Sequence, residues 1–228
     1  RSRGLGDVYK RQVSMNMGEC YKSPLGRAKD TATPCLEVTG KTAEILDWLQ
    51  EFPAQVDLNK NPELEKAYPD VKKEGGYFLP RIAWDMVPGY WTEHEAYMDK
   101  NAWRETEVAK NSDLAEVYDH VIEEFDRFLA EHGYVREGAH YCVEKESDET
   151  VTFFCHFGIS CVLLSHLWNV SPFVLWHCLA LAPTSVTEVV TEEREQGIAY
   201  FRGTKVGDIS HLYAGGEEPA FAARFCEV

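Results

Sequence analysis

The chain has 228 residues, of which 44% are hydrophobic and 12% aromatic, so it can fold around a sizeable core. Its formal net charge of −15 argues against nucleic acid or an anionic membrane as a partner, because both need a positively charged surface. The seven cysteines follow no regular spacing, which is typical of reduced thiols in a cytoplasmic protein rather than of a disulfide framework.

The first twelve residues, RSRGLGDVYKRQ, show no amphipathic period and join abruptly to the segment that follows. The string resembles translated sequencing-adapter read-through, and we expect residues 1–12 to be a non-native tail. Residues 13–228 are then expected to form one domain. The first element of this domain is a predicted strand over Val13–Tyr21, which ends at Lys22 because Pro24 cannot continue a ladder.

Pro24 suits the first turn of a helix, which is predicted to run to about Val38 and to stop at Gly40. Thr42–Leu49 is predicted as a short strand. Residues 53–104 are rich in proline, glycine and aromatic residues, and we expect an insert there. Such an insert is either a functional lid or pocket wall, or a surface excursion with its own aromatic cluster.

Apolar residues at helical spacing predict a long helix over Ser112–Glu131, with Ser112 as its N-cap and Gly133 as its stop. A continuous apolar run, Val151–Cys155, predicts a strand buried on both faces. The further expected elements are strands over Ala139–Glu144, Thr184–Thr191 and Gly197–Val206 and a helix over Gly158–Leu167. This alternation predicts an α/β fold with three layers, in which helices cover both faces of a mostly parallel sheet.

Two segments carry residue types suited to phosphate chemistry. In Ser23-Pro24-Leu25-Gly26-Arg27, a strand ends and a helix starts with an arginine in its first turn, so that guanidinium and helix N-terminus can face one anion. In Cys155-His156-Phe157-Gly158, a histidine stands between a strand and a helix. In an open parallel sheet, that position lies at the carboxyl-end crevice, where ligands bind.

Together these segments resemble the histidine phosphatase superfamily, the phosphoglycerate-mutase-like proteins. The family pattern is Arg-His-Gly on the first strand, then Ser-Pro-Leu-x-Arg-Ala-x-x-Thr-Ala, a later acidic residue and a second His-x-Gly. Residues 23–32 match the second motif and residues 156–158 the last one. The resemblance extends from about residue 13 to the C-terminus, and Ala182–Val186 lies where the family has a strand entering beside the site.

The resemblance implies a phosphatase that hydrolyses a small phosphomonoester through a phosphohistidine intermediate. It implies that Arg27, with Ser23 and Phe157, binds the phosphoryl group and that His156 holds it from the opposite side. Glu51 matches the place of the proton donor. Glu44, Glu93 and Glu95 are competing acids for that role.

One part of the family pattern is absent, because no Arg-His-Gly stands before Ser23 and no histidine lies among the first twenty-two residues. We therefore expect an N-terminally truncated chain that lacks the central first strand and the nucleophile, and that is inactive by itself. The alternative is a catalytically dead pseudo-enzyme of the same fold, which binds phosphate or a phosphoprotein.

A zinc site formed by Cys155, His156, Cys161 and His166 is a further alternative that the spacing disfavours, since the gap between the two cysteines is too long. We expect no metal and no cofactor. The expected partner is a small phosphorylated metabolite. The substrate and the oligomeric state stay open, and a phosphatase is favoured over a mutase, whose fuller set of basic residues is missing.

Overall fold

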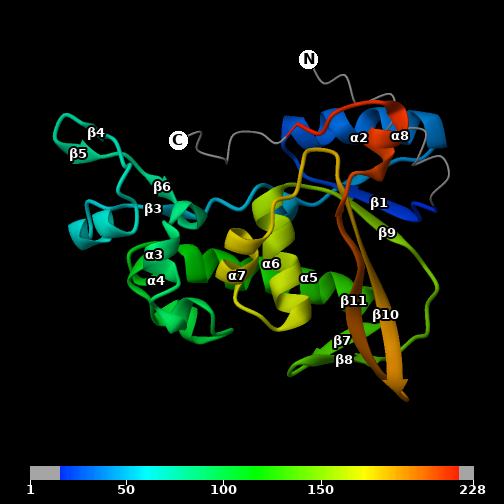
Figure 1. The fold of residues 1–228 in the computed structure, drawn as a ribbon. Helices are drawn as coiled ribbons and strands as arrows, with labels where there is room; N and C mark the ends of the chain where they lie inside the picture. Colours follow the sequence, from blue (N-terminus) through cyan, green and yellow to red (C-terminus); the bar gives the residue numbers. More distant parts are fainter. Residues whose placement is uncertain (1–15, 221–228) are drawn as a thin grey trace. The chain divides into compact units, whose positions relative to one another are not determined.

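The computed structural model describes residues 16–220, and the tail expected at residues 1–12 lies outside this range, as does the start of the first predicted strand. The chain divides into two compact units, which are described separately (Figure 1). The first unit comprises the described residues up to Glu51, Ala130–Phe157 and the described residues from Ala180 onward. The second comprises Phe52–Leu129 and Gly158–Leu179. The expected single domain stays a prediction.

The first unit contains a three-stranded parallel sheet with the strand order β2-β1-β9. Its strands are β1 (Glu19–Lys22), β2 (Glu44–Ile45) and β9 (Val151–Phe154). Lys22 pairs with Phe154, so β1 and β9 end at the same level of the sheet. The backbone N–H of Ser23 donates to the Phe154 carbonyl at 2.9 Å and extends this pairing by one residue.

One face of this sheet is covered by α2 (Gly26–Thr39), which begins after Pro24 and ends at Gly40 with a left-handed φ of 67°. The apolar residues between helix and sheet are Met17, Cys20, Ala32, Cys35, Leu36 and Phe154. On the opposite face, Phe153 has its ring centroid 5.9 Å from those of Tyr21 and Trp48. The glycine that ends the helix and the alternation of strand side chains between two faces both depend on residues close together in the chain. Features of this kind can be predicted from the sequence.

The larger sheet of the first unit is antiparallel, with the order β10-β11-β8-β7. Its strands are β7 (Tyr134–Glu137), β8 (His140–Val143), β10 (Val186–Glu195) and β11 (Ile198–Asp208), and α8 (Ser210–Gly215) follows. The prediction of a mostly parallel sheet is therefore wrong for the described residues. β10 and β11 are joined directly by a tight connection, which only antiparallel strands allow.

The second unit is mainly helical. Its short strands are β3 (Gln55–Val56), β4 (Lys73–Glu74), β5 (Tyr77–Phe78) and β6 (Arg81–Ile82). Its α-helices are α3 (Pro88–Trp91), α4 (Glu107–Lys110), α5 (Leu114–Glu131), α6 (Phe157–Trp168) and α7 (Pro172–Cys178). The last two residues of α5 and the first residue of α6 belong to the first unit. Five 3₁₀ segments complete the fold: η1 (Asp47–Leu49) in the first unit, and η2 (Pro62–Lys66), η3 (Ala83–Asp85), η4 (Glu95–Tyr97) and η5 (Ala102–Glu105) in the second.

The expected aromatic-rich insert, residues 53–104, supplies much of the core of the second unit. Tyr97 and Trp103 are buried, and their ring centroids lie 4.9 and 5.9 Å from that of Phe173 in α7. Phe173 also contacts Trp176, at 5.2 Å. These aromatic side chains are therefore packed against α7 inside the unit, and the role of the insert stays a prediction.

Most elements predicted from periodicity are present, but several differ in detail, among them the first strand, which covers only Glu19–Lys22 of the described residues. The segment Thr42–Leu49 contains a two-residue strand followed by a 3₁₀ turn rather than one continuous strand. In β9 only Phe154 is buried, whereas a strand buried on both faces was expected. Among the described residues, β9 is an outer strand of its three-stranded sheet, and its apolar run therefore overstates its burial.

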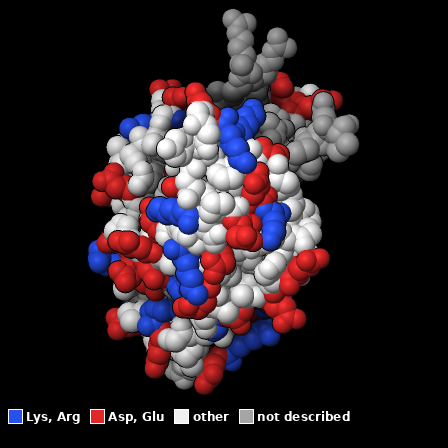
Figure 2. Space-filling view, turned by 90° about the vertical axis from the view of Figure 1, so that its left-hand side faces the viewer, with Lys and Arg blue, Asp and Glu red and all other residues white. Residues whose placement is uncertain are grey.

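The charges of the surface are mixed. On the face that Figure 2 shows, lysine and arginine side chains stand among aspartate and glutamate side chains and form no large single-sign area. None of the described helices combines the length and the apolar character that crossing a bilayer requires.

Candidate functional site

Two parallel strands bring Ser23 and His156 together. Ser23 follows β1 directly, and His156 comes two residues after the end of β9. Because the two strands are paired in register, both residues lie at the carboxyl edge of the sheet. His156 Nε2 lies 2.9 Å from Ser23 Oγ, within hydrogen-bonding distance. The two motif segments are therefore in direct contact at this edge.

Ser23 is fully buried and has a structural part in this arrangement. Its Oγ accepts a hydrogen bond from the Leu25 backbone N–H at 3.2 Å, which holds the turn between β1 and α2. A buried hydroxyl of this kind is not accessible to a substrate as a nucleophile. Ser23 therefore orients His156 and the start of α2 rather than forming a serine–histidine catalytic pair.

Arg27 lies in the first turn of α2, and its side chain is exposed. Within residues 16–220, no carboxylate forms an ion pair with its guanidinium group. The first turn of α2 contains no acidic residue either. Since the N-terminus of a helix also favours negative charge, this corner of the first unit is suited to an anion despite the acidic composition of the chain.

His156 is partly buried, and its pKa is below the ordinary value, first because burial disfavours the charged ring and second because Arg27 is near. The ring is therefore neutral at neutral pH. A neutral imidazole has one N–H donor and one acceptor nitrogen, so it can hydrogen-bond to Ser23 and to a bound oxyanion at the same time. Arg27 and His156 both carry hydrogen-bond donors, and their roles in binding a phosphoryl group stay predictions.

Phe157 and Glu51 both belong to the first unit. Phe157 is the first residue of α6, directly after His156, and is half-buried. Glu51 stands just beyond η1, in the chain that leaves β2, and is half-buried as well. Their roles in substrate binding and proton transfer stay predictions. Glu44 lies on β2 and is exposed, while Glu93 and Glu95 belong to the second unit.

The residues of the alternative zinc site have other partners. His156 contacts Ser23, and His166 Nε2 lies 2.9 Å from both carboxylate oxygens of Asp126. Cys161 is buried inside α6.

A different cluster of side chains was missed. Glu137, His140 and Cys142 lie on the β7–β8 hairpin, with one ligand-type atom of each within 4.8 Å of the others. The sequence signal for this cluster was the spacing of His140 and Cys142, which places both side chains on one face of the predicted strand. Glu137 could not be assigned to the same cluster from the sequence, because β7 was not predicted as a strand.

Comparison with known proteins rests on structure, since no protein-family model and no curated protein matches the sequence. Phosphoserine phosphatase from Entamoeba histolytica matches with a TM-score of 0.53 and 14% identity, over 92% of this chain and 83% of that one. YhfR from Bacillus stearothermophilus matches with a TM-score of 0.51 and 16% identity, over 92% and 83%. Phosphoglycerate mutase from Bacillus anthracis gives 0.50 and 18%, over 94% and 81%.

These likenesses establish the fold. The chain has the α/β fold of phosphoglycerate-mutase-like proteins, which is the fold that the resemblance of residues 23–32 and 156–158 implies. The solved structures that share it include a phosphatase crystallised with phosphoserine and a phosphoglycerate mutase.

Proposed function

We propose that the chain binds the phosphoryl group of a small phosphomonoester at Arg27 and His156, with Ser23 orienting the imidazole, as part of a phosphatase of the histidine type. The observation that carries this proposal is the contact between His156 and Ser23, which holds a neutral imidazole beside the first turn of α2. Arg27, in that turn, has no carboxylate partner among residues 16–220. An anion with several equatorial oxygens suits this set of donors.

In the proposed complex, the Arg27 guanidinium donates two parallel hydrogen bonds to phosphoryl oxygens. His156 donates to a third oxygen from the side of β9, and the N-terminus of α2 adds its partial positive charge. Donors fixed in this way stabilise the charge that spreads over the equatorial oxygens during phosphoryl transfer. Phe157, next to His156, is proposed to contact the substrate.

Hydrolysis through phosphohistidine needs a second histidine that attacks phosphorus. As its nitrogen bonds to phosphorus, the bond from phosphorus to the alcohol oxygen breaks, and Glu51 is proposed to donate its proton to that oxygen. Water then attacks the phosphohistidine, Glu51 takes a proton from this water, and phosphate leaves. The chain contains no Arg-His-Gly sequence for the nucleophile. We therefore assign binding to this chain and turnover to a protein that also has the nucleophile.

The alternative is a phosphate-binding protein of the same fold without catalytic activity. The absence of an Arg-His-Gly sequence favours it, whereas the retained acid at Glu51 favours a phosphatase. The two functions share the proposed phosphate contacts. They differ in whether Glu51 matters, because a protein that only binds phosphate has no use for a proton donor.

Calorimetric titration with inorganic phosphate and with orthovanadate tests the proposed binding. Arg27→Ala and Arg27→Lys are both expected to weaken binding by about tenfold or more, since lysine cannot replace a two-pronged contact. Arg127→Ala is the matched control, because it also removes one exposed arginine, whose partner Glu124 lies on the same helix. Equal affinity in the Arg27→Ala and Arg127→Ala proteins would overturn the proposal.

Assays with an aryl phosphate test the assignment of turnover. The 228-residue chain is expected to release no phosphate above background. Hydrolysis that disappears in the Arg27→Ala protein but persists in the Arg127→Ala protein would show that the chain has a nucleophile of its own. Loss of that activity in Glu51→Gln would then support the phosphatase over the binding protein.

A further inference from the structure

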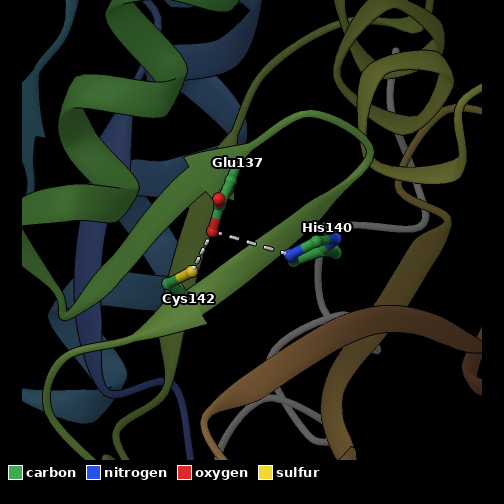
Figure 3. A group of neighbouring side chains, drawn as sticks. All are labelled: Glu137, His140 and Cys142. Carbon is green, nitrogen blue, oxygen red and sulfur yellow. Dashed lines mark hydrogen bonds and ion pairs between the residues drawn. The ribbon is translucent and has the colours of Figure 1, made fainter.

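The β7–β8 hairpin brings three potential metal ligands to one face of the antiparallel sheet (Figure 3). Glu137 and His140 are directly opposed in the register, on either side of the turn at Gly138 and Ala139. His140 and Cys142 are separated by one residue on β8, so their side chains point to the same face. The three side chains therefore meet because of the strand register and not by a chance contact of long loops.

The distances between the ligand atoms are close to those around a single small ion. Cys142 Sγ donates to Glu137 Oε2 at 2.9 Å, and His140 Nε2 lies 3.9 Å from the same oxygen. Bonds from a tetrahedral zinc ion to sulfur, nitrogen and oxygen hold pairs of ligand atoms roughly 3.3–3.8 Å apart. The observed distances lie on either side of this range. Small side-chain rotations would adjust them, without any movement of the backbone.

The chemical types of the three ligands favour one group of metals. Thiolate, imidazole and carboxylate together suit zinc and the neighbouring divalent transition metals, whereas calcium and magnesium prefer oxygen ligands alone. We propose that Glu137, His140 and Cys142 bind one zinc-type divalent ion, with water in the remaining position. This site is separate from the proposed phosphate site and does not depend on it.

The neighbouring strands hold the ligands in place and keep positive charge away. Cys142 is paired on both sides, with Val135 of β7 and Ile198 of β11, so the backbone under the thiol is fixed. Arg136 belongs to the other face of β7, where its guanidinium lies 4.9 Å from the centre of the Tyr141 ring. The nearest cationic residue along the chain is therefore on the face of the hairpin opposite to the three proposed ligands.

The thiol of Cys142 lies beside a carboxylate, since its Sγ donates to Glu137 Oε2 at 2.9 Å. A divalent cation bound between the two groups would be attracted by a thiolate and a carboxylate at once. The bound ion would also connect β7 to β8 through side chains, in addition to their backbone hydrogen bonds.

Titration of the full chain with Co²⁺, in the presence of a reductant that contains no thiol, tests the proposal. Cobalt bound by a thiolate gives a sulfur-to-metal charge-transfer band, and we expect this band to saturate at one equivalent and to disappear when Zn²⁺ is added. Zn²⁺ is also expected to raise the melting temperature, because an ion that binds only the folded state stabilises it.

Three variants locate the ligands, and two others serve as controls. Cys142→Ser is expected to abolish the charge-transfer band, and His140→Ala and Glu137→Gln to weaken binding by about tenfold or more. Cys178→Ser and His120→Ala change an exposed thiol and an exposed imidazole elsewhere and are expected to bind like the parent chain. Far-ultraviolet circular dichroism checks that each variant is folded.

The proposal is overturned if the parent chain gives no saturable Co²⁺ band, or if Cys142→Ser leaves the band unchanged. Glu137→Gln keeps the shape of an exposed side chain, so it remains informative if the other variants fold poorly. Metal binding that Glu137→Gln and His140→Ala both leave unaltered would likewise assign the ion to another place.

Discussion

His156 Nε2 lies 2.9 Å from Ser23 Oγ, although 133 residues separate the two along the chain. The contact joins the ends of β1 and β9 and fixes the imidazole beside the start of α2. Ser23 is fully buried, whereas His156 is partly accessible, so the pair has an inner, orienting member and an outer member that can meet a ligand. Its consequences can be measured through stability and through titration.

Replacing the orienting hydroxyl should lower both stability and phosphate affinity. Ser23→Ala removes the acceptor of the Leu25 N–H and the partner of His156 at a buried position, and we expect a loss of about 1–3 kcal/mol in the free energy of unfolding. Urea denaturation measures this change. Ser147→Ala is the control, because Ser147 makes a similar turn contact with Glu149 at an exposed position and should change stability little. Equal effects of both substitutions would contradict the orienting role.

The pKa of His156 should respond to Arg27. Burial is the larger cause of the lowered pKa and Arg27 the smaller one, so Arg27→Ala should raise the pKa without restoring the ordinary value of about 6.5. Nuclear magnetic resonance titration of the ring proton measures it, with Arg127→Ala as the comparison. A pKa that stays constant or falls in the Arg27→Ala protein would show that the two side chains are not coupled.

The same lowered pKa gives stability a defined dependence on pH. Between the folded and the unfolded pKa of His156, the unfolded chain binds more protons, so the free energy of unfolding rises with pH across that interval. The contribution is complete above about pH 6.5 and is lost as the pH falls toward the folded value. The free energy of unfolding, measured by denaturation at several pH values, should rise more steeply with pH in the parent than in His156→Gln across this interval. Equal slopes against pH would be inconsistent with the lowered pKa.

The contact between His166 and Asp126 should stabilise the second unit. The imidazole Nε2 of α6 lies 2.9 Å from both oxygens of the α5 carboxylate, and both side chains are largely buried. Asp126→Ala leaves the histidine without this acceptor and is expected to cost about 1–3 kcal/mol. Asp126→Asn keeps an acceptor and should cost less. Glu116→Ala, at an exposed position of α5, should have little effect on thermal unfolding.

Gly18 should be intolerant of any side chain. Its φ is +54°, and a Cβ atom there would lie 1.7 Å from the backbone oxygen of Thr150, next to the β1–β9 pairing. Gly18→Ala is therefore expected to destabilise by at least about 1–3 kcal/mol from backbone strain alone. Gly26→Ala is the control, because nothing lies within 4 Å of the added Cβ. If calorimetry gave equal melting temperatures for the two variants, the close approach of Gly18 to Thr150 would be wrong.

Local signals in the sequence were sufficient for much of the fold. Gly40 ends α2 in a left-handed conformation, as expected, whereas Pro24 lies just before the Leu25 N-cap and not in the first helical turn. The amphipathic period of α5 and the apolar run of β9 mark those elements for the same reason: each depends on residues close together in the chain. The motif around Arg27 and the motif at His156 could therefore be placed on the correct elements.

The pairing of strands could not be predicted from local signals in the sequence. β7 went unpredicted, and with it the opposition of Glu137 and His140 that forms the proposed metal site. The antiparallel sheet was expected to be parallel, because an alternation of strands and helices does not state which strands pair. Pairing is decided by hydrogen bonds and packing between segments far apart in sequence, which no short window contains.

The sequence by itself determined where the segment that resembles a phosphate-binding motif begins, at Ser23 with Arg27 in the following helix turn, and that His156 follows an apolar strand. Only the tertiary structure decided that His156 meets Ser23, that its ring stays neutral, and that Arg27 stays unpaired with any carboxylate of residues 16–220. The physical reason is that helix starts, turns and apolar runs arise from neighbouring residues. The burial, charge and partners of a side chain arise from the segments that the fold brings beside it.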